Sequence, residues 1–267
     1  MSLSVAVAGK GGVGKTTISA LLVRALCSTA VRPVLAVDAD PNSNLAAALG
    51  VEASRPLADI REQGSLPEGS PPSGIGRLRA IDDQLQRAIV EADGFDLITM
   101  GRPEGPRCYC AVNHLLRHAL DKLARSYPAV IVDNEAGMEH LSRRTTTDFD
   151  FLLTVVTPTL PAIRAAQRIE ALAAELPIRI GRRVLLVNRA VQGQLDPRVQ
   201  DVLASLSSQP LPPVPEDPAL EQLGAVGGSV FELPDSSPAV QSVLRVVANL
   251  QELKGGSTIM PERTAGT

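Results

Sequence analysis

Near-continuous apolar runs, rich in Val, Ile and Leu, recur along the chain and alternate with segments of helical periodicity. Continuous hydrophobicity is typical of strands that are buried on both faces, as in a parallel sheet covered by helices. The alternation therefore predicts an α/β fold with a doubly wound, mostly parallel β-sheet flanked by helices. The expected strands are residues 4–8, 34–37, 97–100, 129–132, 151–156 and 184–187, and the expected helices between them are residues 16–26, 84–92, 112–126, 162–175 and 197–205.

The composition indicates one domain with its own core. The chain has 267 residues, of which 44% are hydrophobic, so it can bury a large core without crosslinks. We therefore expect a single domain over residues 1–254. Residues 255–267 have little to bury and are expected to be disordered. Residues 65–76 are rich in Pro, Gly and Ser, which predicts a loop after a short helix at 57–62.

The charge and the cysteine content limit the partners and the compartment that we expect for this protein. The net charge is −3 and the pI is about 5.7, so no global field favours nucleic acid. The chain has three cysteines, which indicates a reducing compartment rather than a disulfide scaffold. The first residues lack the basic region of a signal peptide, and no apolar run reaches the roughly 18 residues of a membrane span. We expect a cytoplasmic protein with neither nucleic acid nor membrane as partner.

Residues 9–16 read G-K-G-G-V-G-K-T and match G-x-x-x-x-G-K-[ST], a phosphate-binding pattern when it joins a strand to a helix. Its glycines let backbone N–H groups turn inward, and the helix N-terminus adds its positive end. Lys15 is expected to contact the β- and γ-phosphates, and Thr16 to offer a hydroxyl to Mg²⁺. The alternative is a turn that only connects two elements. The residues expected to hold ATP or ADP here are Gly9, Lys10, Gly11, Gly12, Val13, Gly14, Lys15, Thr16 and Thr17.

Lys10 is an additional lysine that an ordinary phosphate loop does not require. With it, the segment K-G-G-V-G-K-T-T resembles the signature of the deviant Walker A ATPases, which include septum-site positioning, plasmid-partition, nitrogenase-reductase and metal-insertion proteins. The resemblance implies an ATP-dependent homodimer in which Lys10 reaches the nucleotide of the partner subunit, in a charge role like that of an arginine finger. The alternative is a solvated loop lysine.

Carboxylates follow two of the expected strands, where the ends of parallel strands face the ligand crevice. Asp38 and Asp40 follow one strand, and Asp133 follows another. By resemblance to the same class, Asp40 orients or deprotonates the attacking water, whereas Asp38 and Asp133 belong to the Mg²⁺ shell. Asp40 could also cap the helix that begins near Asn44. Residues 134–144 then correspond to switch II, which responds to loss of the γ-phosphate.

Asn188 lies just past an expected strand, where an amide with a donor and an acceptor can hydrogen-bond the adenine edge. Residues 188–189 resemble the Asn-Arg motif of the same class, and P-V-P-E-D at 213–217 resembles its second base-contacting loop. The resemblance therefore implies that the base contacts come from Asn188, Arg189, Pro215 and Asp217. Taken alone, an asparagine at a strand end is as often a cap or turn residue.

Cys108 and Cys110 stand two residues apart in a Gly- and Pro-rich segment, so both thiols can turn towards one ion. Zinc and nickel sites with soft ligands usually need four donors, and a twofold dimer would supply the second pair. His114 and His118 are additional candidate ligands. The alternative is that the paired cysteines are small apolar residues packed under a loop. Cys27, on the first expected helix, is assigned to the core.

Two segments make the resemblance more specific. G-R-P-E-G-P-R-C-Y-C-A-V-N at 101–113 and D-N-E-A-G-M-E-H-L-S-R-R at 133–144 look like those of the nickel-insertion accessory ATPases of carbon monoxide dehydrogenase, the CooC family. The likeness extends to residues 231–239, while Arg107, Ala111 and residues 65–76 depart from the family pattern. It implies a dimer that binds Ni²⁺ or Zn²⁺ through the paired cysteines and couples ATP hydrolysis to nickel insertion into apo carbon monoxide dehydrogenase.

Two other functions stay open. A reductase related to the nitrogenase iron protein would need four thiolates around an interfacial iron–sulfur cluster, with cysteines from two separate segments, whereas residues 133–137 contain none. A MinD- or ParA-like positioning ATPase that binds a membrane would carry a basic amphipathic C-terminal helix. Residues 239–253 instead have an apolar face that fits a core.

Overall fold

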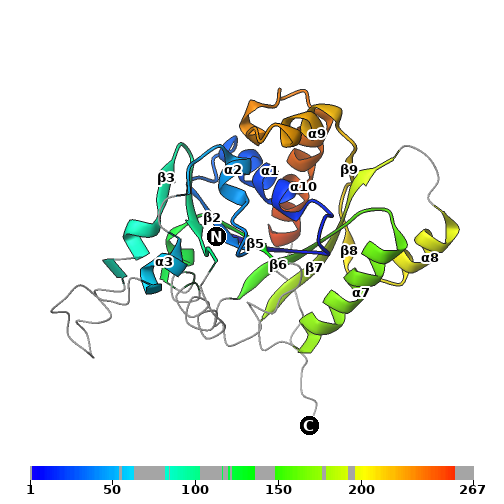
Figure 1. The fold of residues 1–267 in the computed structure, drawn as a ribbon. Coiled ribbons are helices and arrows are strands. Elements are labelled where there is room, and N and C mark those ends of the chain that lie inside the picture. The colour runs from blue at the N-terminus through cyan, green and yellow to red at the C-terminus, as the bar shows by residue number, and fades with distance from the viewer. Residues whose placement is uncertain are drawn as a thin grey trace, which may run out of the picture.

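The described residues form a nine-stranded β-sheet with helices on both faces (Figure 1). The computed structural model describes residues 2–53, 56–62, 82–83, 85–102, 116, 120, 122–135, 148–175, 179–191 and 196–255. The strands are β1 (Leu3–Ala8), β2 (Val34–Ala39), β3 (Val90–Ala92), β4 (Phe95–Thr99), β5 (Ala129–Asn134), β6 (Phe149–Val156), β7 (Ile180–Ala190), β8 (Gln209–Pro210) and β9 (Val214–Pro215). The helices are α1 (Lys15–Cys27), α2 (Leu45–Leu49), α3 (Leu57–Glu62), α7 (Leu160–Glu175), α8 (Pro197–Ala204), α9 (Pro218–Ala225) and α10 (Pro238–Gly255), with 3₁₀ turns η1 (Ala124–Ser126) and η2 (Val230–Glu232).

The strand order confirms the predicted doubly wound sheet. The strands lie in the order β3-β4-β2-β5-β1-β6-β7-β8, and β9 pairs with the end of β7. Neighbouring strands are parallel except for the β3–β4 hairpin at one edge. The chain first builds one side of β1 and later crosses to β6 on the other side. β1 therefore ends at the point where the strand order reverses, and this is where such sheets bind ligands.

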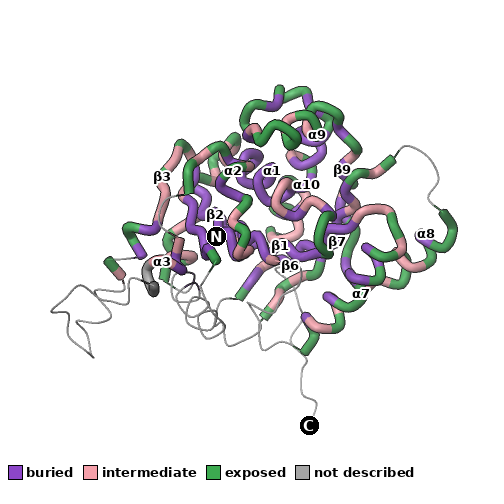
Figure 2. Tube along the Cα trace, in the orientation of Figure 1, coloured by how far each residue is buried: buried purple, intermediate pink, exposed green. Residues whose placement is uncertain are grey.

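Both faces of the sheet are buried, and the helix after β1 is covered on all sides. Val5 and Val7 face the core under α1 and α10, whereas Ala6 and Ala8 face the second cluster on the opposite side of the sheet. α1 lies between the sheet and α10, and its residues 18–26 are all buried. Figure 2 shows this burial along the inner elements. Apart from Ser19 and Arg24, the buried side chains of residues 18–26 are apolar, and a helix with apolar side chains on every side is stable only inside a core.

α10 packs onto α1 with the face that the sequence predicts for it. Val243, Val246 and Leu250 are fully buried in the same core cluster as α1. At the far end of the helix, the Lys254 ammonium contacts an Asp150 carboxylate oxygen at 2.5 Å and also the Ser2 carbonyl. In the described part of the chain, no helix combines the length and the apolar character that a membrane crossing requires.

One expected helix is wrong in its second half. Residues 85–88 are helical, but Val90–Ala92 forms β3, which pairs antiparallel with β4. Asp93 and Gly94 make the turn between them, and Gly94 has φ +84°. Because an Asp-Gly pair favours a two-residue hairpin, pairing with β4 outweighs the local helical periodicity. The short strands β8 and β9 were not predicted, Gly255 belongs to α10 rather than to the tail, and residues 65–76 and 256–267 lie outside the described part.

Candidate functional site

The loop between β1 and α1 lies at the carboxyl end of the sheet, and two of its glycines are required by close contacts. A Cβ on Gly9 would lie 2.4 Å from the Val155 carbonyl oxygen of β6, and a Cβ on Gly14 would lie 2.5 Å from the amide nitrogen of Asn188. Gly14 also has φ +91°, a left-handed conformation that a side chain would strain. The loop can therefore approach its neighbours only with glycine at these positions.

The same loop presents the free N-terminus of α1. Gly14 occupies the N-cap position, no side chain of the described residues caps the helix, and no acidic residue lies in its first turn. The unpaired N–H groups and the helix dipole together favour a bound anion such as a phosphate. Lys15 is largely buried, with its ammonium 3.4 Å from the Lys10 carbonyl oxygen, whereas the Lys10 residue itself is exposed. The loop thus carries two lysines, Lys15 in its interior and Lys10 at its surface.

Two carboxylates stand side by side beneath this loop. Asp38 on β2 pairs in register with Asp133 on β5, and both are almost completely buried. Asp38 accepts hydrogen bonds from the backbone N–H groups of Asp40 at 3.1 Å and of Leu45 at 2.8 Å. The alternative role of Asp40, as a cap of the following helix, is not seen in the structure, because Asp38 holds the Leu45 N–H at the start of α2. Asp40 instead accepts hydrogen bonds from Asn42, at 2.8 and 2.9 Å.

Asp133 has one satisfied and one unsatisfied oxygen. Ser19 on α1 donates a hydrogen bond to its Oδ1 at 3.1 Å, whereas Oδ2 is buried and has no hydrogen-bond partner among the residues that the structure describes. A buried carboxylate oxygen without a donor favours a cation or a cation-bound water. The Thr16 hydroxyl lies near enough to Asp133 to lower its pKa, and Asp38 pairs in register with Asp133, so oxygen donors of the kind that Mg²⁺ prefers come together here. Their chemistry therefore fits this ion.

Burial raises the pKa of both carboxyl groups. For Asp38, desolvation raises the pKa to about 7, opposed by the Leu45 N–H and reinforced by the charge of Asp133. For Asp133, desolvation raises the pKa to about 6, opposed by the hydroxyls of Thr16 and Ser19 and by the charge of Lys15. The two negative charges are thus unfavourable without a compensating cation, and Mg²⁺ would relieve this.

Without Mg²⁺ and nucleotide, the wild-type protein should lose stability relative to an Asp38→Asn variant as the pH rises from 3.8, the ordinary pKa of the carboxyl group, to about 7. The folded-state pKa of Asp38, about 7, lies above the ordinary value of 3.8, so the folded protein binds the additional proton between these values. Its stabilising contribution is complete below the unfolded pKa and is lost as the pH rises through about 7. Urea unfolding in EDTA at several pH values measures this difference. Parallel pH profiles of the two proteins would contradict the prediction.

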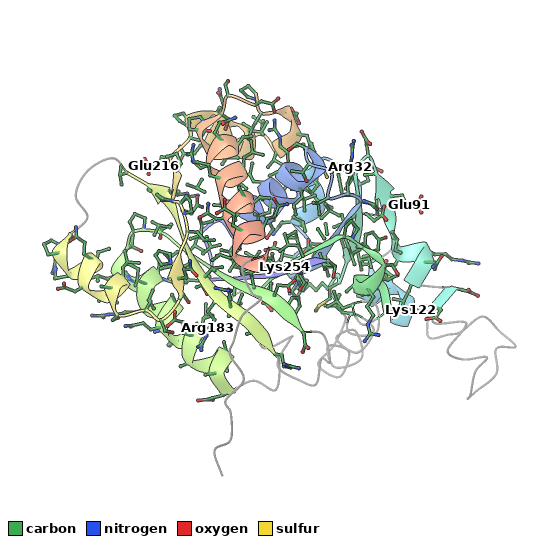
Figure 3. All side chains as sticks on the ribbon, turned by 180° about the vertical axis from the view of Figure 1, so that it is seen from behind. Arg32, Glu91, Lys122, Arg183, Glu216 and Lys254 are labelled. Atoms are coloured by element: carbon green, nitrogen blue, oxygen red, sulfur yellow. The ribbon has the colours of Figure 1, made fainter. Side chains whose placement is uncertain are left out.

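A cavity of about 440 Å³ opens beside the phosphate loop, between the end of β7 and α9. Asn188 binds the loop directly, because its amide donates to the Val13 carbonyl at 2.8 Å. Arg189 follows with φ +53°, a strained left-handed conformation that is typical of functional sites. Figure 3 shows Glu216, after β9, at the cavity end of this strand layer and Arg183, near the start of β7, at the other end. The cavity is lined by Gly14, Thr17, Ala48, Asn188, Arg189, Pro215, Glu216, Asp217, Leu220, Glu221, Leu223, Gly224, Ala225, Gly228 and Val230.

The predicted base-contacting residues all line this cavity, but they do not all have free side chains. Asn188, Arg189, Pro215 and Asp217 are among the lining residues. The carboxylate of Asp217 is buried and is occupied by hydrogen bonds within the protein. The wall formed by α9 was not predicted. Its sequence signals were the Asp-Pro pair that opens the helix and the glycines that follow it.

The predicted metal-binding segment lies outside the described residues. This applies to Cys108, Cys110, His114 and His118, and to residues 136–144 of the predicted switch II. Cys27 is partly buried against the core and its thiol contacts the Gly94 carbonyl at 3.2 Å. Within the described ranges, no group of three or more His, Cys, Asp or Glu side chains could hold a metal ion. A Mg²⁺ site that depends on phosphate and water oxygens does not require such a group.

Comparison with known proteins places the chain in a family. The model of the CobQ/CobB/MinD/ParA nucleotide binding domain matches residues 4–230. Because this match covers most of the chain, the protein belongs to that family. Together with the fold, it identifies an ATP-binding NTPase of the MinD/ParA type.

Individual relatives agree with this assignment. The chain is 34% identical over 248 residues to the uncharacterized ATP-binding protein MJ0685 of Methanocaldococcus jannaschii, covering 92% of this chain and 97% of the relative. It is 38% identical over 192 residues to the carbon monoxide dehydrogenase accessory protein CooC of Rhodospirillum rubrum, covering 66% of this chain and 71% of the relative. The septum site-determining protein MinD of Pyrococcus horikoshii, solved with Mg-ADP, aligns with a TM-score of 0.71 at 21% identity, over 96% of this chain and 98% of that chain. This structural likeness shows the shared fold.

Proposed function

We propose that this protein is an ATP-dependent maturation factor that carries nickel to carbon monoxide dehydrogenase. The observation that carries the proposal is the 38% identity to CooC in a chain that has the paired cysteines Cys108 and Cys110. Thiolates are suitable ligands for Ni²⁺ or Zn²⁺, and a second pair from a partner subunit would complete four-coordination. The ion is the cargo of the reaction, and ATP supplies the change of state that releases it.

The described residues support a specific role for each part of the nucleotide site in this proposal. The N–H groups at the start of α1 bind the phosphates, and Lys15 neutralises the charge that builds up during γ-phosphoryl transfer. Thr16, Asp38 and Asp133 would hold Mg²⁺, which supplies charge compensation at the β- and γ-phosphates. Asp40 is partly exposed next to this pair and orients the attacking water. The cavity beside the loop would hold the nucleobase, because Asn188 lines this cavity and also contacts the phosphate loop.

The proposed active form is an ATP-dependent homodimer in the cytoplasm. Lys10 is exposed at the surface of the loop, so its ammonium is available to the nucleotide of a partner subunit. A twofold axis would bring Cys108 and Cys110 of both subunits together. Loss of the γ-phosphate would then be transmitted through residues 134–144 to the metal site.

A role in membrane positioning has less support from α10. Membrane-binding relatives would need a basic helix with an unpartnered apolar face. Here Val243, Val247 and Leu250 are already buried in the core. Their burial favours a structural role for the C-terminal helix.

Metal titration tests the proposal. Wild-type protein should bind one Ni²⁺ or Zn²⁺ per two chains, and a Cys108→Ser/Cys110→Ser variant should lose this binding, because the paired thiolates supply the ligands. Isothermal titration calorimetry with and without ATP, together with light scattering, gives the stoichiometry and the oligomeric state. Cys27→Ser is the matched control and should bind as wild type does, since burial raises the pKa of the Cys27 thiol to about 11. Equal binding by wild type and the double variant would refute the metal part of the proposal.

A further inference from the structure

α9 forms one wall of the cavity but is weakly anchored by apolar contacts. None of its residues, all of which the structure describes, is fully buried, and only Leu220 and Leu223 pack against the core cluster. Figure 2 shows the helix mostly exposed or intermediate. The glycine-containing segment that follows includes Val226, which is 77% exposed. The position of this wall must therefore depend strongly on polar contacts.

Asp217 provides such a contact, because its carboxylate caps two helices at once. Oδ1 accepts hydrogen bonds from the N–H groups of Ala219 at 3.0 Å and Leu220 at 3.4 Å, at the start of α9. Oδ2 accepts from the Ser237 hydroxyl at 2.5 Å and the Ala239 N–H at 3.1 Å, at the start of α10. The carboxylate thus joins the first turns of both helices.

The surroundings of Asp217 favour its charged form. Only 3% of the residue is exposed. Burial disfavours the charge, yet the hydrogen bonds from Ser237, Ala239, Leu220 and Ala219 together hold the pKa of this carboxyl below its usual range. Two helix N-termini directed at one carboxylate stabilise the anion further. Both oxygens are occupied, so this side chain is not available to hydrogen-bond a nucleobase.

This double cap, the Asp217 carboxylate bonded to the first turns of α9 and α10, connects the cavity wall to the phosphate loop. α10 packs on α1, and α1 begins at the loop. Asp217 therefore fixes α9 relative to the element that binds the phosphates. We propose that Asp217 is a positioning residue that sets the nucleobase end of the site through this double cap, rather than by touching the nucleotide. The inference rests on the proposed assignment of the cavity to the nucleobase and is independent of metal delivery.

The test compares Asp217→Asn with a matched control, Asp196→Asn. Asp196 is also an Asp before a proline that caps a helix of 8 residues, α8, through the Arg198 N–H at 2.9 Å, and it does not line the cavity. The affinities for ATP and for inorganic tripolyphosphate, each with Mg²⁺, are measured by calorimetry. The side-chain amide in Asp217→Asn would keep one acceptor oxygen for α9 but lose the second for α10. The ATP affinity should fall about ten-fold or more, whereas the tripolyphosphate affinity should change less than about two-fold.

Controls separate positioning from general damage. Ser237→Ala removes one hydrogen bond between Asp217 and the start of α10, and it should also lower the ratio of ATP affinity to tripolyphosphate affinity. Asp196→Asn should leave this ratio unchanged. An unchanged ratio in Asp217→Asn, or equal losses for both ligands, would overturn the positioning role while the nucleobase assignment stands. A wild-type protein that binds ATP no better than tripolyphosphate would overturn the assignment of the cavity as well.

Discussion

Lys15→Ala should reduce ATP hydrolysis by at least about 100-fold and should also weaken nucleotide binding. The Lys15 side chain is largely buried inside the phosphate loop, where its ammonium contacts a backbone carbonyl at 3.4 Å and has further donors for phosphate oxygens. Alanine removes the one positive charge that the loop places inside its own cradle. Phosphate release under saturating ATP and calorimetric titration with ADP measure the two effects.

Lys10→Ala is the variant to compare with Lys15→Ala, because Lys10 belongs to the same loop but is exposed. It should keep ADP affinity close to wild type while hydrolysis falls, since its proposed contact is with the nucleotide of the partner subunit. Hydrolysis by Lys15→Ala within about ten-fold of wild type would argue against the assigned role of the loop.

Arg24→Met should destabilise the fold by about 2–4 kcal/mol. The Arg24 guanidinium, on α1, donates to the carbonyl oxygens of Val230 at 2.5 Å and Leu233 at 2.9 Å, and to the Asp235 carboxylate at 2.8 Å. Its side chain is 11% exposed. Methionine fills similar space but removes the side-chain donor from both carbonyls, and the Val230 carbonyl then keeps only the longer hydrogen bond from the Leu233 N–H at 3.4 Å. Urea denaturation in the absence of nucleotide gives the difference in free energy of unfolding.

Asp235→Asn is the matched control for Arg24→Met. The Asp235 side chain is 94% exposed, so its ion pair with Arg24 is screened by solvent and should contribute less than about 1 kcal/mol. The two carbonyl contacts of Arg24 remain in this variant. Similar destabilisation by both substitutions would show that the exposed ion pair, and not the carbonyl contacts, provides the stability.

The parts of the site that depend on contiguous residues could be predicted from the sequence. The loop at residues 9–16 contains its phosphate-binding groups in one contiguous pattern. The buried parallel strands place Asp38, Asp133 and Asn188 at the carboxyl ends of the strands. The strand–helix alternation was sufficient for the fold class because each element is long and strongly apolar. These predictions use only local pattern and the general behaviour of parallel sheets.

The remaining features depend on contacts between distant residues, which no local pattern encodes. Spacing could not determine whether Asp38 or Asp40 would bind the Leu45 N–H, because both lie at suitable distances along the chain. Similarly, the position of Asp217 in a resembling loop suggested a base contact, whereas its partner Ser237 lies 20 residues further along. The helical periodicity before Asp93 was outweighed by pairing with β4.

The pairing of Asp38 with Asp133 has a consequence for how this chain tolerates insertions and deletions. Because side chains alternate between the two faces of a strand, removing one residue within β2 would turn the Asp38 carboxylate to the opposite side of the sheet, away from its neighbour on β5. The number of residues in these two central strands is therefore constrained by the need to keep both carboxylates on the same side of the sheet, and not by packing alone. The hairpin at Asp93 and Gly94, on the outer edge, has no such constraint, and length variation between homologous proteins should accumulate there first.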